Sequence, residues 1–221
     1  MSGRGFTVAL IGCDGAGKTS VARSLERRAE LRVRYLYMGV GLDSRQHQLP
    51  TTRLANAIKR GRETSAQNAA APPFGLGRRV RRGARSALRL SNRMAEEWYR
   101  QLLANRHLRR GRIVVFDRHF TADYHAADIL APQRTLFRRL HGLMLMRLYP
   151  TPDLVIFLDA PGEVLFARKH EGSVASLERR RAEYRRFIST LDSVATVDAT
   201  QPLDGVIGEV VELIRDHGAK P

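Results

Sequence analysis

Eight consecutive residues near the amino terminus have the types and spacing of a phosphate-binding loop. Residues 12–19 read GCDGAGKT and fit the pattern Gly-x-x-x-x-Gly-Lys-Ser/Thr. Glycines let the backbone fold so that its N–H groups point into one cup, and the N-terminus of a following helix adds positive potential. Lys18 would reach the β- and γ-phosphates of a nucleotide, and the hydroxyl of Thr19 would ligate magnesium. The expected nucleotide-binding residues are Gly12, Asp14, Gly15, Ala16, Gly17, Lys18, Thr19 and Ser20. A glycine-rich turn without a ligand is the alternative interpretation.

A second pair of chemically active residues follows the apolar segment IVVFD. Asp117 ends this segment, and Arg118 comes directly after it. Ligands of open α/β sheets bind at the carboxyl ends of the strands, so an acid in this position would face the phosphates. We expect Asp117 to orient magnesium or its water and Arg118 to point towards an acceptor or the transferred phosphate. A simple ion pair between these two neighbours is the alternative.

Apolar runs of strand length alternate with helical patterns along the chain. Such strands, apolar along their whole length, are typical of a parallel sheet covered on both faces. The sequence therefore predicts an α/β fold, a P-loop NTPase-like three-layer α/β/α sandwich with a central parallel five-stranded sheet. Strands are expected at 6–11, 32–38, 113–117, 154–159 and 194–199, and helices at 18–30, 91–109, 133–148, 161–169, 176–191 and 203–217. In the helix at 91–109 we expect Met94, Trp98 and Leu102 to face the core.

Residues 1–221 are interpreted as a single domain that carries a basic insertion at about 43–90. Pro50, Pro72 and Pro73 and several glycines argue against regular structure there, although residues 52–60 could form a short helix. Between Arg53 and Arg93 there are eleven basic residues and one acid. Phe74 is the one aromatic residue of this arm, which argues against nucleic acid as the partner because single-strand binding uses aromatic platforms.

The composition narrows the class of protein. The chain has 38 Lys plus Arg against 22 Asp plus Glu, a formal net charge of +16, and only four of the basic residues are lysines. Arginine suits phosphate recognition, although a lineage bias would give the same count. The single cysteine, Cys13, permits no intramolecular disulfide, and no apolar stretch reaches the roughly 18 residues of a membrane span. We expect a cytoplasmic protein that does not contact membranes.

Three segments resemble the landmark segments of thymidylate kinases and their P-loop kinase relatives. They are CDGAGKT, RRGRIVVFDRH at 109–119 and LDAPGEVLFAR at 158–168, and they occur in the family's order. The resemblance implies a magnesium- and ATP-dependent phosphotransferase with a basic lid at about 168–178. Family members are often dimers, so a homodimer is one option.

The resemblance also implies roles for individual residues. Residues Glu178, Arg179, Arg181 and Tyr184 match a helix that follows the lid in the family, and Ser91-Asn92-Arg93 is similar to an acceptor-side motif. The catalytic set is then Lys18, Asp117, Arg118 and Arg168, the acceptor-binding set Asp14, Arg93, Arg118 and Arg181, and the metal-binding set Thr19 and Asp117. The lid charges that would neutralise the moving phosphoryl group are Arg168, Lys169, Arg179 and Arg181, whereas Arg180, Arg185 and Arg186 are expected on the surface.

Departures from the family concentrate on the acceptor side. Ile11 stands where the family has Glu, MGVGLDS replaces the Pro-Gly-Gly turn, Arg89 takes the place of a base-stacking Phe, and FTADYHAAD replaces the residues after Asp117-Arg118. The leading hypothesis is γ-phosphate transfer from ATP to a small acceptor, a nucleoside monophosphate. One alternative is a hydroxyl kinase of a sugar, nucleoside or biosynthetic intermediate, with Asp14, Asp117 or Asp123 as base. The other is a nucleotide-switched protein that binds a polyanion.

Overall fold

The structure is a computed structural model, and it describes residues 5–38, 76–119, 122 and 135–219. Five parallel strands form one sheet in the order β2-β3-β1-β4-β5. The strands are β1 (Thr7–Ile11), β2 (Val33–Tyr37), β3 (Ile113–Asp117), β4 (Leu154–Asp159) and β5 (Val194–Asp198). The helices are α1 (Lys18–Arg27), α3 (Leu76–Leu108), α5 (Leu136–Arg147), α6 (Gly162–Lys169), α7 (Val174–Ile188) and α8 (Leu203–Ala219), with a short 3-10 helix at Ala29–Leu31.

Burial along the strands follows their place in the sheet. Every residue of the central strands β1 and β3 is buried, as are the first five residues of β4. The edge strands β2 and β5 mix buried and exposed positions, because one side of each has no neighbouring strand. Continuous apolar runs are what a parallel sheet with two covered faces requires.

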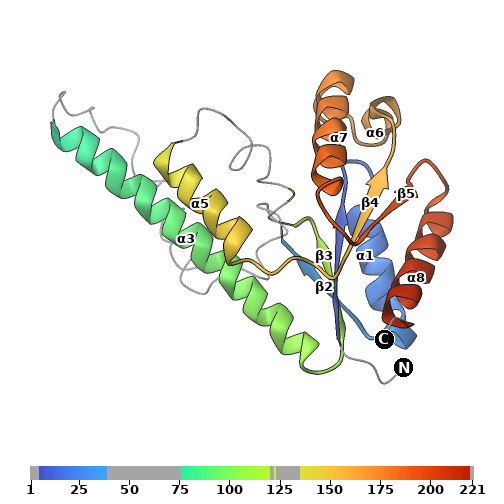
Figure 1. The fold of residues 1–221 in the computed structure, drawn as a ribbon. Coiled ribbons are helices and arrows are strands. Elements are labelled where there is room, and N and C mark those ends of the chain that lie inside the picture. Colours follow the sequence, from blue (N-terminus) through green and yellow to red (C-terminus); the bar gives the residue numbers. More distant parts are fainter. Residues whose placement is uncertain (1–4, 39–75, 120–121, 123–134, 220–221) are drawn as a thin grey trace, which may run out of the picture.

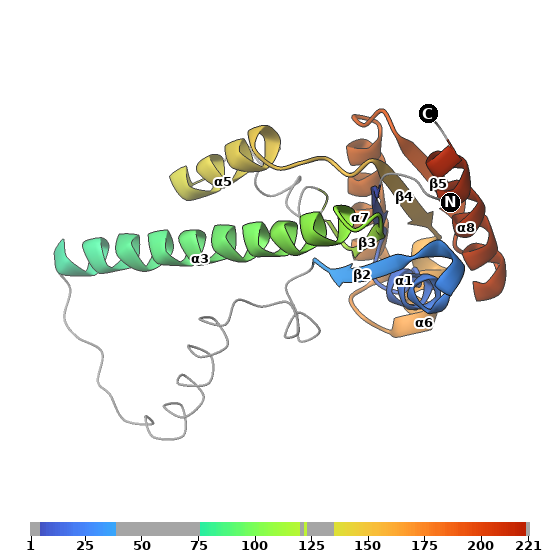
Figure 2. The ribbon, with the colours of Figure 1, turned by 90° about the horizontal axis from the view of Figure 1, so that it is seen from below.

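Helices cover both faces of the sheet and make the predicted three layers. Helices α1 and α8 pack together on one face, and α3 and α7 contact the strands from the other (Figure 1). Helix α5 lies against α3, and Figure 2 shows the two running side by side away from the sheet. The P-loop NTPase-like α/β fold predicted from the sequence is confirmed. No helix among the described residues has the length and apolar character needed to cross a bilayer.

Helix α3 differs from the prediction at its start and in its buried face. It begins at Leu76, so residues 76–90, predicted to be part of an irregular insertion, are helical; arginine is a good helix former, and no proline follows Pro73 in this stretch. Residues 43–75, with the helix expected at 52–60, lie outside the described residues.

The expected core position of Trp98 and Leu102 is wrong. Their relative exposures are 39% and 63%, while Glu97, Arg100, Gln101 and Ala104 are buried. Polar burial is tolerated there because each charge finds a partner. Nε2 of His141 on α5 lies 3.1 Å from Oε1 of Glu97, and Arg100 donates to the backbone oxygen of Met38 at 2.8 Å.

Candidate active site

The connection between β1 and α1 folds as the sequence predicts for a phosphate cradle. Gly12, Gly15 and Gly17 have φ angles of 146°, 90° and 87°. A Cβ atom on Gly12 would lie 2.5 Å from the oxygen of Leu158, and one on Gly15 would lie 2.8 Å from the oxygen of Leu165. Only glycine fits these positions without displacing backbone, and the loop leads into the N-terminus of α1, where N–H groups and the helix dipole favour an anion.

Lys18 lies over this loop, and its side chain is buried. Its ammonium group donates to the backbone oxygens of Gly12 at 2.9 Å and Cys13 at 2.8 Å. These bonds hold the amine at the mouth of the loop. A lysine in this position would reach the β- and γ-phosphates of a nucleotide held by the loop.

Thr19 and Asp117 meet at the carboxyl edge of the sheet. The hydroxyl of Thr19 donates to Oδ2 of Asp117 at 2.5 Å, and the hydroxyl of Tyr35 on β2 reaches the same oxygen at 3.3 Å. A hydroxyl and a carboxylate beside a phosphate cradle are hard oxygen ligands of the kind that magnesium takes together with water and substrate phosphates. These two residues therefore fit the metal role predicted for them. Tyr35 was not among the predicted site residues.

Arg118 and Asp14 join β3 to the phosphate loop. The guanidinium of Arg118 forms an ion pair with the Asp14 carboxylate, and Arg180 on α7 approaches the same carboxylate at 3.9 Å. Burial by itself would raise the pKa of Asp14, but the positive charges of Arg118, Lys18 and Arg180 outweigh it and hold that pKa below its ordinary value. Arg118 also has a φ of 65°, in the left-handed region. Arg32 and His170 share this conformation at the ends of helices, whereas Arg118 has it directly after a strand.

Arg168 lies at the end of α6, beside the phosphate loop. Its guanidinium donates to the backbone oxygen of Ala199 at 2.7 Å and, more weakly, to that of Thr200 at 3.5 Å. Arg168, Thr200 and Gln201 line a cavity of about 430 Å³ that also touches Gly15 and Gly17. This position suits the base or sugar of a bound nucleotide, beside the loop that would hold its phosphates.

Arg181 is held by two carboxylates. It makes a two-pronged contact with Asp159, Nε to Oδ1 at 2.6 Å and Nη2 to Oδ2 at 3.0 Å, and lies 3.3 Å from Oε1 of Glu178. Arg185 adds a bond to Oδ2 of Asp159 at 2.7 Å. The Glu178 carboxylate also accepts the backbone N–H of Gly162 at 2.5 Å, which ties the start of α6 to α7. The structure therefore places Arg181 at the end of β4, where it is held by Asp159.

The remaining predicted residues are spread around this centre. Arg93 is exposed on α3. It lies about 10 Å along the helix from Arg100, the residue that bonds to Met38 just after β2, because seven residues separate the two arginines. Lys169 pairs with Glu171 at 2.9 Å, while Arg179 and Ser20 are exposed. Asp123 lies outside the described residues.

Sequence reasoning missed Asp159, Arg180 and Arg185 as members of the charged network. Asp159 ends an apolar strand as Asp117 does, and this signal could have found it. Arg180 and Arg185 were expected on the surface, and their side chains are indeed 43% and 56% exposed. Helix α7 turns both towards carboxylates that come from other elements.

Two groups near the site are neutral. Burial raises the pKa of the Cys13 thiol to about 11, and its Sγ lies 3.6 Å from the backbone oxygen of Leu177. Burial lowers the pKa of His119 to about 4, and its ring packs against Phe116 at 5.6 Å between centroids. Neither residue is suited to acid–base or nucleophilic work near neutral pH. No group of three His, Cys, Asp or Glu side chains among the described residues could hold a metal by itself.

The fold resembles that of a thymidylate kinase. The enzyme from Candida albicans superposes with a TM-score of 0.60 over 98% of this chain and 93% of its own, at 17% sequence identity. No family model matches the sequence. At this identity the likeness establishes the fold, and it agrees with the resemblance carried by the phosphate loop, the Asp117-Arg118 segment and the segment at 158–168.

Proposed function

We propose that this protein is a magnesium-dependent kinase that transfers the γ-phosphate of ATP to a nucleoside monophosphate. The observation that carries the proposal is the arrangement at the carboxyl edge of β1 and β3. Lys18 caps a glycine cradle, and Thr19 bonds to Asp117 directly beside it. Phosphoryl transfer depends on positioning and on positive charge around the moving group, and these residues supply both.

Charge around Asp14 supports a phosphorylated acceptor. One carboxylate faces Arg118 and Arg180 and lies within the field of Lys18, which leaves a positive excess next to the phosphate loop. Such an excess favours an anionic acceptor over a neutral alcohol. A phosphate acceptor is ionised near neutral pH and needs no base, whereas a hydroxyl acceptor would use the Asp14 carboxylate to accept its proton.

In this proposal the base of ATP binds near Arg168, in the cavity that this residue lines. Thr19 and Asp117 would hold magnesium, directly or through water, and the metal would neutralise charge on the β- and γ-phosphates. Arg181, bound to Asp159, would reach the acceptor only after exchanging that partner. The proposed location is the cytoplasm, in agreement with a lone reduced cysteine. A homodimer stays a prediction.

The test is ADP formation from ATP and magnesium over a panel of nucleoside monophosphates, nucleosides and sugars. Lys18→Ala serves as the inactive variant, and Arg215→Ala, which removes an exposed cation on α8, serves as the matched control. Stimulation by a monophosphate in the wild type and the control, but not in Lys18→Ala, is the expected result. Stimulation by an unphosphorylated alcohol would replace the proposal with a hydroxyl kinase. A rate of ATP turnover that neither any acceptor nor Lys18→Ala changes would refute both the monophosphate kinase and the hydroxyl kinase.

A further inference from the structure

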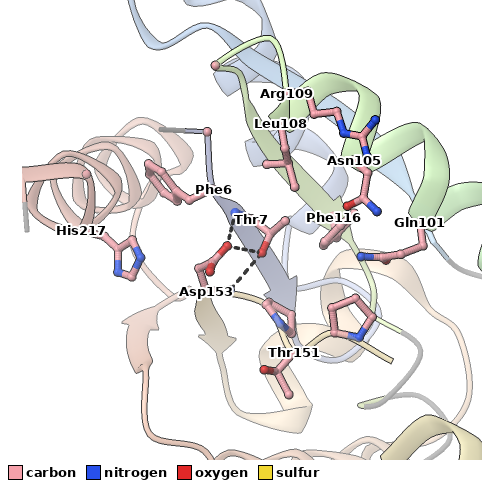
Figure 3. A pocket seen from close by; sticks show the side chains of 15 residues that line it. Phe6, Thr7, Gln101, Asn105, Leu108, Arg109, Phe116, Thr151, Asp153 and His217 are labelled. Atoms are coloured by element: carbon pink, nitrogen blue, oxygen red, sulfur yellow. Dashed lines mark hydrogen bonds between the residues drawn. The ribbon is translucent and has the colours of Figure 1, made fainter. Parts of the chain in front are cut away.

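A groove lies at the amino-terminal ends of the strands, whereas the phosphate loop lies at their carboxyl ends. Its volume is about 1180 Å³, and α3, the start of β1, the segment 150–153 and the end of α8 surround it. Figure 3 shows Gln101 and Asn105 at one end of this groove, His217 and Phe6 at the other, and Asp153 between them. Strand β1 begins at this groove and ends at the phosphate loop, so its five residues separate the two sites by about 13 Å or more.

Two residues that line the groove each carry a buried polar atom, closed off from water, that has no hydrogen-bonding partner among the described residues. These atoms are Oε1 of Gln101 and Nδ1 of His217. The side chain of Gln101 comes from the buried face of α3, and the residue is only 4% exposed. Buried polar groups are rarely left unsatisfied, because each costs free energy on folding. A rotation of the Gln101 carboxamide would turn this oxygen into the groove, where an N–H or O–H group of a ligand would remove that cost.

Between the two ends of the groove, Asp153 and Thr7 bond to each other and form a fixed surface. Oδ2 of Asp153 accepts from the backbone N–H and the hydroxyl of Thr7, both at 2.7 Å, and the backbone N–H of Asp153 donates to that hydroxyl at 2.9 Å. These bonds satisfy Oδ2 of Asp153 and hold its side chain in one orientation. Planar and apolar side chains complete the lining, with Phe6 tilted against the His217 ring at 5.0 Å between centroids.

We propose that this groove is a second binding site, separate from the phosphate loop, for an adenine nucleoside or nucleotide. A carboxamide pairs with adenine through two bonds, because its oxygen accepts from the exocyclic amine while its NH₂ donates to N7. Gln101 lines the groove with such a carboxamide, and Asn105 offers another one turn away on the same helix. Aromatic and proline side chains suit the face of a base, and Arg109 in the same lining suits a phosphate.

The proposal does not rest on the proposed kinase activity, because binding at the two edges of the sheet can be observed separately. The experiment is an NMR titration of the ¹⁵N-labelled full chain with adenosine. Gly218, Thr151 and the side-chain NH₂ of Gln101 report on the groove, while Gly15 and Thr200 report on the cavity that Arg168 lines, the donor cavity. Saturable shifts of the groove signals are expected. Shifts confined to Gly15 and Thr200, or none at all, would overturn the proposal.

Inosine and two variants test the chemistry of recognition. Inosine replaces the exocyclic amine by an oxygen and should bind the groove about 10-fold more weakly, since the two-bond pairing is lost. Gln101→Leu should weaken adenosine binding to the groove by about 10-fold or more and leave the donor-cavity signals unchanged, which also reports that the variant is folded. His217→Phe, which keeps an aromatic ring beside Phe6, should weaken it less. Equal affinity of the groove for adenosine and inosine, or an affinity for adenosine that Gln101→Leu leaves unchanged, would refute adenine recognition by this residue.

AMP distinguishes a nucleoside site from a nucleotide site. If the phosphate is bound, AMP will bind the groove more tightly than adenosine, and Arg109→Ala will abolish the difference. Arg106→Ala removes an exposed arginine of α3 outside the groove lining and is the matched control. Equal affinity for AMP and adenosine would assign the groove to nucleosides. Loss of the AMP preference in Arg106→Ala as well as Arg109→Ala would contradict a phosphate contact by Arg109.

Discussion

The Asp159–Arg181 contact provides a quantitative test of the charged network between β4 and α7. Asp159→Asn keeps the size of the side chain but removes the charge that receives two bonds from Arg181 and one from Arg185. The side chains of Asp159 and Arg181 are 13% and 18% exposed. The pair is therefore largely shielded from water, and its loss leaves two guanidinium groups without their shared carboxylate.

The magnitude follows from this geometry. Hydrogen bonds to charged groups contribute about 1.5–3 kcal/mol, and breaking a fully buried pair costs about 3–5 kcal/mol. Partial exposure reduces the cost, and asparagine keeps one acceptor, so we expect Asp159→Asn to lower the free energy of unfolding by about 2 kcal/mol. For a domain of this size the midpoint of thermal unfolding should fall by about 4–8 °C.

The dependence on pH has a definite sign. Burial would raise the pKa of Asp159, but its bonds to Arg181 and Arg185 outweigh burial and hold the pKa below its ordinary value. A group with a lowered pKa stabilises the folded protein above its unfolded pKa, near 3.9 for Asp, and loses that contribution as pH falls through the folded pKa. The difference between wild type and Asp159→Asn should be complete at pH 7 and should shrink below about pH 4.

The assay is chemical denaturation of both proteins at pH 7, 5 and 3. Glu212→Gln is the matched control, because it removes the carboxylate of an exposed pair with Arg215 on α8, whose side chains are 68% and 46% exposed. Exposed pairs contribute little, so this control should change stability by about 0.5 kcal/mol or less. An effect of Asp159→Asn no larger than the control, or one that is the same at pH 3 and pH 7, would refute the reasoning.

Three further predictions concern the phosphate loop and its surroundings. Gly15→Ala should weaken binding of magnesium-ATP by 10-fold or more in calorimetry, because its Cβ would meet the oxygen of Leu165 at a φ of 90°; unchanged affinity would contradict the loop geometry. Cys13 should react with a disulfide reagent at pH 8 orders of magnitude more slowly in the folded than in the unfolded protein, since burial raises its pKa to about 11; equal rates would contradict the buried thiol. Arg168→Ala should weaken ATP binding but leave the affinity for inorganic tripolyphosphate unchanged, because Arg168 lines the cavity beside the loop; an equal loss for both ligands would place Arg168 at the phosphates.

Local patterns predicted the strands and the cradle because each of them is specified by residues close in sequence. Apolar strand runs and the residues 12–19 specify their own backbone conformation. Thr19 and Asp117 were both predicted as metal-binding residues, and they lie together because the carboxyl ends of the strands in a parallel sheet share one edge.

Long-range charge pairing could not be predicted in the same way. Arg181 binds a carboxylate 22 positions earlier, and the sequence alone favours neither that partner nor a phosphate. The buried face of α3 was also misassigned, because Glu97 and Arg100 are buried through partners on other elements while Trp98 and Leu102 remain exposed. The spacing of apolar residues along a helix does not show which buried charges have partners on other elements.

The central claim is that Lys18, Thr19 and Asp117 act together in moving a phosphoryl group from ATP to an acceptor. The most direct measurement is a single-turnover reaction with ATP labelled in its γ-phosphate, magnesium and a nucleoside monophosphate, followed by separation of the products. The account predicts that the label moves to the monophosphate in the wild type and in Arg215→Ala, and that transfer is lost in Lys18→Ala and when magnesium is removed. Label that stays on ATP or appears only as inorganic phosphate, whichever monophosphate is supplied, would contradict the account.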